Sequence, residues 1–143
     1  ARILPIYEGT TAIQANDLLG RKTLRDQGAT ATRLAGMIAG TEAALRQGSL
    51  IATDIADRLA AAREDFQSTV AHLLTATPSD AYGAAVPFLM LAGNLVSGWQ
   101  MARSVLVQGD SDFMTAKIAT ARFYTHHILP ETGLQRIRAT AGL

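Results

Sequence analysis

A long run of apolar residues at intervals of three or four positions constrains the fold of this chain more than any other feature. The run comprises Ile51, Ile55, Leu59, Ala62, Phe66, Val70 and Leu73. This spacing places them on one face of an α-helix. The other faces carry charged residues that we expect to form a solvated surface with pairs four residues apart. These residues are Asp54, Asp57, Arg58, Arg63, Glu64 and Asp65.

Similar patterns predict helices before this segment. We expect Thr10 or Thr11 to cap a helix that runs to about residue 19 and ends at Gly20. Residues 21–30 are polar and are interpreted as a linker. A second helix fits 30–47, and it ends before Gly48. Its inner stripe is formed by Leu34, Ile38 and Leu45.

Three further helices are expected after the long one. The segment 77–80, Thr-Pro-Ser-Asp, stops the long helix and can cap the next. Pro87 lies in the first turn of that next helix or kinks it. Gly93 and Gly98 allow a neighbouring helix to approach closely. The stripe of the helix that contains Pro87 is formed by Phe88, Ala92, Leu95, Trp99, Ala102 and Leu106, widened by Leu89 and Val96. A further helix is expected over 112–127, with an inward face formed by Met114, Ile118, Ala121 and Ile128. Pro130 ends it, and a short final helix has Leu134 and Ile137 on its inward face.

Amphipathic helices joined by short loops predict an all-α fold, an up-and-down antiparallel helical bundle. We expect two parts, residues 1–29 and a helical bundle over 30–143. The net charge of +1 gives no reason to expect nucleic acid as a partner. Without cysteine, thiolate metal sites and disulfides are excluded. No apolar run is long enough to span a bilayer.

The segment 6–14, Ile-Tyr-Glu-Gly-Thr-Thr-Ala-Ile-Gln, is the candidate for chemistry. A carboxylate at Glu8 beside apolar neighbours can be partly desolvated, which raises its pKa and favours a role as a base. The hydroxyls of Thr10 and Thr11 lie at the predicted start of a helix. The free backbone N–H groups at such a start can bind a phosphate. The alternative is a solvated loop glutamate before a capped helix, and composition alone favours that alternative.

The string Tyr-Glu-Gly-Thr-x-x-Ile-Gln at 7–14 resembles the signature near the end of the catalytic domain of acyl-CoA dehydrogenases. The segment 17–22, Asp-Leu-Leu-Gly-Arg-Lys, continues as in a bacterial branch that has an added C-terminal helical domain. This branch includes 3-methylmercaptopropionyl-CoA dehydrogenase-like enzymes. Gly98-Trp99 and the segment 123–130 are also similar to that extension. The resemblance covers nearly the whole chain and is sharpest over residues 3–22.

The resemblance implies roles for five residues. Glu8 matches the base that takes the α-proton of an acyl-CoA thioester while the β-hydrogen leaves as hydride to the flavin. Its backbone N–H matches a donor to the thioester oxygen, a role worth about 2.7–4 kcal/mol where it has been measured. Gly9 lies against the substrate in the family, and Thr10, Thr11 and Ala12 match the stretch that contacts FAD. Many relatives have glutamine at the position of Ala12.

The resemblance also implies acyl-CoA as substrate, electron transfer flavoprotein as electron acceptor, a dimeric or tetrameric parent and a bacterial cytoplasmic location. Because the family assembles its flavin and CoA sites from further domains, we expect this chain to be an inactive fragment of a longer protein. Two alternatives stay open. One is a non-catalytic helical interaction or oligomerisation module. The other is an acyl-CoA oxidase that passes electrons to O₂.

The three histidines and the single tryptophan are interpreted as structural residues. His126 and His127 are adjacent, so in a helix they point about 100° apart and cannot easily share a metal. We expect them to cap the end of their helix near Pro130. His72 is expected at the surface, and Trp99 is expected in the core. A ligand-stacking role for Trp99 is the alternative.

Overall fold

The structure is a computed structural model that describes residues 10–107 and 109–141. The helices begin and end as follows: α1 Thr11–Asn16, the π-helix η1 Asp17–Leu24, α2 Ala29–Leu45, α3 Leu50–Thr75, α4 Pro78–Gly83, α5 Ala85–Val105, α6 Asp112–His127 and α7 Glu131–Thr140. The described residues contain no strand. The all-α prediction is therefore confirmed, although the short helix α4 was not expected.

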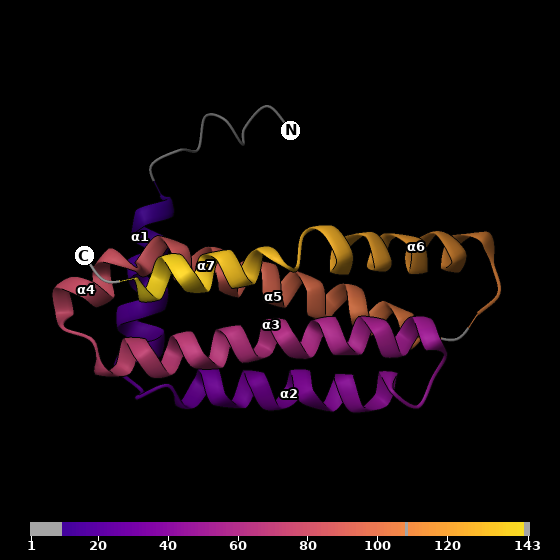
Figure 1. The fold of residues 1–143 in the computed structure, drawn as a ribbon, viewed down its shortest axis with the longest axis horizontal. Helices are drawn as coiled ribbons and strands as arrows, with labels where there is room; N and C mark the ends of the chain where they lie inside the picture. Colours follow the sequence, from indigo (N-terminus) through magenta and orange to yellow (C-terminus); the bar gives the residue numbers. More distant parts are fainter. Residues whose placement is uncertain (1–9, 108, 142–143) are drawn as a thin grey trace.

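The long helices form an up-and-down antiparallel bundle (Figure 1). α2, α3 and α5 alternate in direction, and α6 and α7 run end to end to complete the bundle. Pro130 separates α6 from α7, as predicted, because proline lacks the N–H that would continue the helix. α1 and η1 together stand steeply across one end of the bundle, where α1 packs against α5 and η1 packs against α4 and α5. None of the described helices has the length and apolarity needed to cross a membrane.

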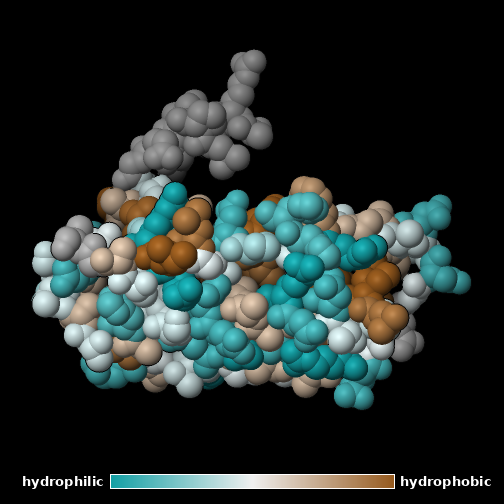
Figure 2. Space-filling view, viewed as in Figure 1, coloured by the Kyte–Doolittle hydropathy of each residue, from teal (hydrophilic) through white to brown (hydrophobic). Residues whose placement is uncertain are grey.

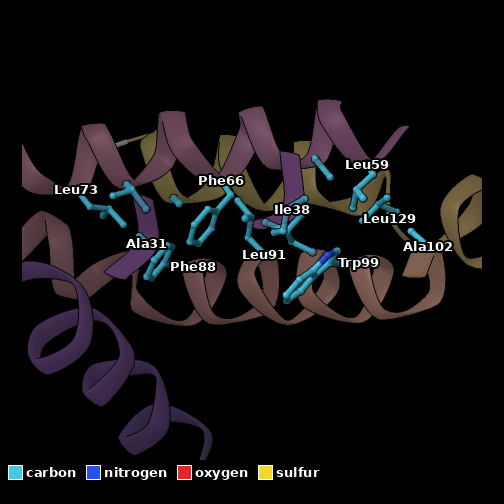
Figure 3. Close-up of a cluster of buried hydrophobic side chains, with 14 of the residues drawn as sticks. Ala31, Ile38, Leu59, Phe66, Leu73, Phe88, Leu91, Trp99, Ala102 and Leu129 are labelled. Carbon is cyan, nitrogen blue, oxygen red and sulfur yellow. The ribbon is translucent and has the colours of Figure 1, made fainter. Parts of the chain in front are cut away.

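α3 and α5 form the centre of the core, since they pack against each other and each also packs against α2, α6 and α7. Its predicted stripe is buried from Ile55 to Leu73, whereas Ile51, in the first turn, is 39% exposed. Figure 3 shows side chains of α2, α3 and α5 meeting in one apolar layer. Phe66 and Phe88 stack there with ring centroids 5.8 Å apart. Each large side chain removed from water contributes about 1.5–3 kcal/mol to folding.

The inner face of α5 agrees with the predicted stripe in its middle and departs from it at the end. Phe88, Leu95, Trp99 and Ala102 are buried, and Ala92 is half-buried. Leu106 is 41% exposed because the helix ends at Val105. Leu91 is fully buried although the predicted stripe omitted it. Pro87 lies in the first turn of α5, where its missing N–H has no helical acceptor to lose.

Only one of the two predicted close approaches to α5 occurs. A Cβ added to Gly98 would lie 2.7 Å from the Cδ1 atom of the buried Leu129, so α5 and the α6–α7 junction touch at this glycine. Gly93 faces open space, with nothing within 4 Å of an added Cβ.

Hydroxyl caps start three of the helices. Ser49, Thr77 and Ser111 accept hydrogen bonds from the backbone N–H groups of Ala52, Asp80 and Met114, which satisfies donors that the helices leave free. The cap at Thr77 confirms the stop and start predicted for 77–80.

The prediction that the first helix is capped by a threonine and ends at Gly20 is wrong. The Thr10 side chain makes no capping hydrogen bond, and α1 continues directly into η1. A glycine ends a helix when it adopts a left-handed conformation. That conformation is found at Gly28, with φ of +76°, not at Gly20. Gly20 instead leaves room for the hydroxyl of Tyr82, which a Cβ would meet.

The linker expected over residues 21–30 is largely replaced by helix, and only 25–28 connect η1 to α2. η1 continues to Leu24, and the chain then turns at Gly28 from across the bundle to along it, where α2 begins. The Asp26 carboxylate accepts hydrogen bonds from the N–H groups of Gly28 and Thr30, which fixes this turn. α2 matches the predicted helix at both ends within two residues.

The expected inward face of α7 is also wrong. Leu134 and Ile137 are 48% and 55% exposed, and Thr132, Gln135 and Ala139 face the core. Polar contacts explain why α7 turns a different face to the core than predicted. The Thr132 hydroxyl and the Arg136 Nε both bond to the carboxylate of Asp65 on α3, at 3.1 and 2.8 Å.

Candidate functional site

The predicted site lies at the N-terminal end of α1, and its described part is Thr10, Thr11 and Ala12. Glu8 and Gly9 lie outside the described residues. Thr10 precedes the helix, and its carbonyl accepts a hydrogen bond from the Gln14 N–H at 2.8 Å. Thr10, Thr11 and Ala12 are all exposed. The hydroxyl-bearing first turn is therefore accessible to a ligand or to another part of a longer protein.

The bundle holds α1 in place from its other end. Ala15 and Leu19 are completely buried, and α1 and η1 both pack against α5. The Thr23 hydroxyl donates to the Leu18 carbonyl, an oxygen of η1 itself. On the exposed side, Arg21 pairs with Asp17, and the hydrogen bond from Arg21 lowers the pKa of the Asp17 carboxyl. The exposed first turn of α1 thus belongs to a helix whose C-terminal half packs against the bundle.

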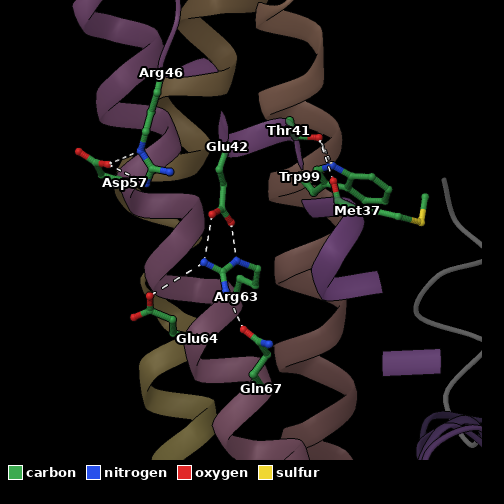
Figure 4. Close-up of polar contacts among 9 residues, drawn as sticks. All are labelled: Met37, Thr41, Glu42, Arg46, Asp57, Arg63, Glu64, Gln67 and Trp99. Atoms are coloured by element: carbon green, nitrogen blue, oxygen red, sulfur yellow. Dashed lines mark hydrogen bonds and ion pairs between the residues drawn. The ribbon is translucent and has the colours of Figure 1, made fainter. Parts of the chain in front are cut away.

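A second candidate for chemistry is the buried carboxylate of Glu42, which pairs with Arg63 between α2 and α3 (Figure 4). Arg63 Nε donates to Oε1 at 2.7 Å, and a terminal nitrogen donates to Oε2 at 3.1 Å. A further nitrogen of Arg63 donates to Gln67 Oε1 at 2.6 Å. The hydrogen bond that Arg63 donates to Glu42 raises the pKa of Arg63, although burial of the guanidinium lowers it. With both oxygens occupied, the carboxylate is held in an ion pair and is not free to act as a base.

Sequence reasoning did not single out Glu42, although the sequence contains a signal for it. Ala35, Ile38, Glu42 and Leu45 recur at intervals of three or four, so the glutamate stands within the buried stripe of α2. A carboxylate at such a position requires a buried cation as partner.

The charged residues of α3 form the expected solvated surface only in part, since Asp57 and Glu64 are exposed but others pair with neighbouring helices. Only Asp54 and Arg58 pair within the helix at a separation of four. Arg63 and Asp57 pair with Glu42 and Arg46 of the α2 side, and Asp65 pairs with Arg136 of α7. Because other helices pack against α3, Arg63 and Asp65 meet partners across the interfaces, whereas the remaining charges belong to the hydrophilic surface that covers much of the bundle in Figure 2.

His126 joins α6 to α3 instead of capping the end of α6. Its Nε2 atom lies 2.7 Å from Oδ2 of Asp54. Burial raises the pKa of the Asp54 carboxyl, but the hydrogen bond with His126 and the charge of Arg58 outweigh this effect, so the pKa is lowered overall. His127 is exposed and lies against the Phe123 ring, 4.8 Å between centroids. His72 is exposed, as expected.

Trp99 is a core residue, as expected, and only 8% of it is exposed. Its Nε1 donates to the Thr41 hydroxyl of α2 at 2.8 Å, a contact that Figure 4 shows beside the Glu42 pair. The Arg103 guanidinium lies 5.4 Å from the centre of the indole ring. The hydrogen bond joins α5 to α2, whereas the contact with Arg103 lies within α5.

The described residues therefore divide into two groups. The polar clusters around α3 are internally paired and connect helices. Across residues 10–107 and 109–141, no buried side-chain nitrogen or oxygen lacks a hydrogen-bond partner, and no three acids and histidines gather as a metal would require. The exposed turn at Thr10, Thr11 and Ala12 is the part of the predicted site that remains open to a ligand.

Comparison with known proteins assigns this helical chain to a family. Residues 23–143 match the model of the family described as acetyl-CoA dehydrogenase C-terminal like. The chain therefore belongs to this family, and the resemblance to acyl-CoA dehydrogenases is confirmed.

Two curated relatives extend the similarity towards the N-terminal motif. A 3-methylmercaptopropionyl-CoA dehydrogenase of Ruegeria pomeroyi is 53% identical over 150 residues, which cover 98% of this chain and 26% of the relative. A broad-specificity linear acyl-CoA dehydrogenase, FadE5 of Mycobacterium tuberculosis, is 32% identical over 149 residues. That alignment covers 91% of this chain and 24% of the relative. The chain thus spans about a quarter of the length of these relatives.

Proposed function

We propose that this chain is the C-terminal part of an FAD-dependent acyl-CoA dehydrogenase and that Glu8 is the base of the reaction. The observation that carries the proposal is the 53% identity along 98% of the chain to a relative named as an acyl-CoA dehydrogenase. The string Tyr7–Gln14, which matches the catalytic signature of that family, supports it independently. In this proposal residues 1–29 complete the catalytic part and residues 30–143 form the helical extension.

The chemistry assigned to Glu8 is removal of the α-proton of an acyl-CoA thioester. The α C–H bond is a weak acid, so the negative charge that develops on the thioester oxygen needs a hydrogen-bond donor. The backbone N–H of Glu8 is assigned this role. When bound, FAD would accept the β-hydrogen as a hydride, which leaves a double bond between the α and β carbons. Gly9 is assigned to the substrate side because a side chain there would occupy space beside the reacting carbons.

The described residues fit a cofactor that carries phosphate and hydroxyl groups. Thr10 and Thr11 present hydroxyls on an exposed turn, and the first N–H groups of a helix lack acceptors within it. Ala12 can offer only its backbone, whereas many relatives hold a glutamine there. We therefore assign the contacts with FAD to the two threonines and to the main chain at Ala12.

The proposal is tested by replacing Glu8 in the full-length parent. The variant Glu8→Gln should keep its FAD content and lose turnover by about 10²–10⁴-fold, since a positioned base contributes an effect of that size. Glu8→Asp should retain part of the activity. Turnover should be measured with 3-methylmercaptopropionyl-CoA and with a linear acyl-CoA, because the names of the two relatives give these substrates. Near-normal turnover of Glu8→Gln would eliminate the assignment and favour a non-catalytic helical module.

The electron acceptor is a separate part of the proposal. We assign electron transfer flavoprotein, so the parent should reduce this partner and yield little hydrogen peroxide in air. A peroxide yield that matches substrate consumption would identify an oxidase instead.

The chain by itself should be inactive, because the CoA and flavin sites of the family are assembled with further domains. Titration of the 143-residue chain with FAD should give no tight binding and no turnover. A bacterial cytoplasmic location and a dimeric or tetrameric parent remain predictions.

A further inference from the structure

α1 and η1 form one continuous rod over residues 11–24, the α1–η1 rod, which joins the exposed turn at Thr10 and Thr11 to the bundle. Figure 1 shows this rod across the end of the bundle where α4 lies. α1 packs against α5, and η1 packs against α2, α3, α4 and α5. The position of the exposed turn is therefore set by contacts that lie further along the rod.

The π-helical half of the rod determines which residues face the bundle. Ala15, Leu19 and Thr23 are all buried, so the inner face repeats every four residues across the junction of α1 and η1. In a continuous α-helix the residue seven positions after Ala15 would share its face, and that residue is Lys22. The wider turns of η1 bring Thr23 inward instead and leave 56% of the Lys22 side chain exposed. The rotation of the rod thus keeps a charged side chain out of the core.

A contact with α4 fixes where the rod lies. The ring of Tyr82 packs so closely on Gly20 that an added Cβ would collide with the hydroxyl oxygen. Gly20 has no positive φ, so its backbone conformation does not require glycine. The same Cβ would lie 3.4 Å from Cζ of the ring, which is an ordinary contact. Among the described residues, the hydroxyl oxygen of Tyr82 is therefore the atom that excludes a side chain at position 20.

The backbone that carries Tyr82 is anchored on both sides. Ala81 and Ala84 are buried. Thr77 caps the start of α4, since its hydroxyl oxygen accepts from the Asp80 N–H and its hydroxyl donates to the Asp80 carboxylate at 2.7 Å. Because α4 is held in this way, a methyl group at position 20 should press the rod away from the tyrosine.

We propose that Tyr82 and Gly20 are positioning residues, whose contact holds the α1–η1 rod, and with it the segment 8–11, in the place that proton removal requires. This proposal rests on the assignment of Glu8 as the base. It gives the helical extension a part in catalysis, because Tyr82 belongs to residues 30–143 and Gly20 does not. A displacement of about 1 Å at a reacting group can cost about 10²-fold in rate, so a small movement of the rod should be measurable as turnover.

A cycle of substitutions in the full-length parent tests the contact. Gly20→Ala inserts a methyl group against the hydroxyl and should lower kcat at least about tenfold. Tyr82→Phe leaves a gap at the same place and should lower kcat by a smaller factor. The combined variant exchanges the oxygen for the methyl group, which then lies beside Cζ, and should recover most of the activity. A combined variant no more active than Gly20→Ala would overturn the proposal.

Two further readouts separate positioning from a general loss of structure. Substrate deuterated at the α-carbon should slow Gly20→Ala at least as much as it slows the unmodified parent, because proton removal is the impaired step. Hydrogen exchange of the amides at 11–24 in the parent should become faster in both single variants and slower again in the combined one. Unchanged exchange and turnover in Gly20→Ala would mean that the tyrosine ring turns into water, and would refute the role of the contact.

Controls distinguish a failure of this proposal from a failure of the base assignment. Gly36→Ala adds a methyl group to α2 with nothing within 4 Å and should leave kcat unchanged. Glu8→Gln is assayed beside the cycle. Loss of turnover in Glu8→Gln together with full turnover in Gly20→Ala would overturn the positioning role alone. Near-normal turnover in Glu8→Gln would overturn the base assignment and the positioning role together.

Discussion

Arg63 of α3 donates two hydrogen bonds to the carboxylate of Glu42 on α2, and only 2% of that glutamate is exposed. Both carboxylate oxygens are therefore occupied by one guanidinium inside the interface between two helices. Such a pair is sensitive to the loss of either partner, because the group left behind remains in a region of low polarity.

Removing the cation should cost more than neutralising the acid. Arg63→Met leaves a buried carboxylate without a counter-charge, and we expect the free energy of unfolding to fall by about 3 kcal/mol. Glu42→Gln keeps one accepting oxygen but turns an amide NH₂ towards a guanidinium donor, so it should cost about 1–2 kcal/mol. Arg46→Met is the control, because its pair with Asp57 is exposed and worth at most about 1 kcal/mol. Urea denaturation measures all three, and equal losses for Arg63→Met and Arg46→Met would contradict this account.

Two glycines of α5 should respond in opposite directions to the same substitution. Gly98→Ala places a methyl group against the buried Leu129 and should destabilise the protein by about 1–2 kcal/mol, since overpacking outweighs the gain in helix propensity. Gly93→Ala adds its methyl group in open space and should stabilise the protein by up to about 1 kcal/mol. Thermal unfolding followed by circular dichroism compares them. A stabilised Gly98→Ala variant would mean that Leu129 has room to move.

The hydrogen bond between Trp99 and Thr41 can be followed by fluorescence, because the chain contains a single tryptophan. Thr41→Val leaves the indole N–H without its acceptor in a nearly buried position, so the free energy of unfolding should fall by about 1–3 kcal/mol. The emission spectrum of the folded state should shift as well. Thr41→Ser keeps an acceptor and serves as the control. An unchanged emission and stability in Thr41→Val would show that water replaces the hydroxyl.

The contribution of Asp54 to stability should depend on pH in a defined direction. Its folded pKa is lowered from the ordinary value of 3.8, with His126 and Arg58 outweighing the effect of burial. A carboxyl with a depressed folded pKa stabilises the protein above its unfolded pKa, and this stability is lost as the pH falls through the folded value. The melting temperature of Asp54→Asn should thus lie below that of the unmodified chain at neutral pH and approach it as the pH falls below the ordinary carboxyl pKa of 3.8.

The same measurement in a His126→Gln background isolates the contact between α6 and α3. Without the imidazole, the Asp54 pKa should lie closer to its ordinary value, so the difference caused by Asp54→Asn should be smaller and less dependent on pH. An undiminished pH dependence in that background would assign the effect to Arg58 alone.

The helices themselves were largely predictable from the sequence because helix formation follows local periodicity. The apolar stripe from Ile55 to Leu73 was expected to be buried, whichever helices pack against it. The cap at Thr77 depends only on residues adjacent in the sequence. The string at 7–14, which resembles a catalytic signature, was likewise found from adjacent residues alone. Its proposed geometry involves parts of a longer protein, and Glu8 lies outside the described residues, so the assignment of the base stays a proposal.

The sequence alone thus determined where the long helices lie, which faces are apolar, and which short string matches a catalytic signature, since each of these depends on residues near one another in the chain. Tertiary structure decided the partners of the charged residues, the rotation of α7 and the continuation of α1 past Gly20. Arg63 and Asp65 met Glu42 and Thr132 because separate helices pack around α3. No local pattern specifies which distant side chain will stand opposite a given charge once the bundle has formed.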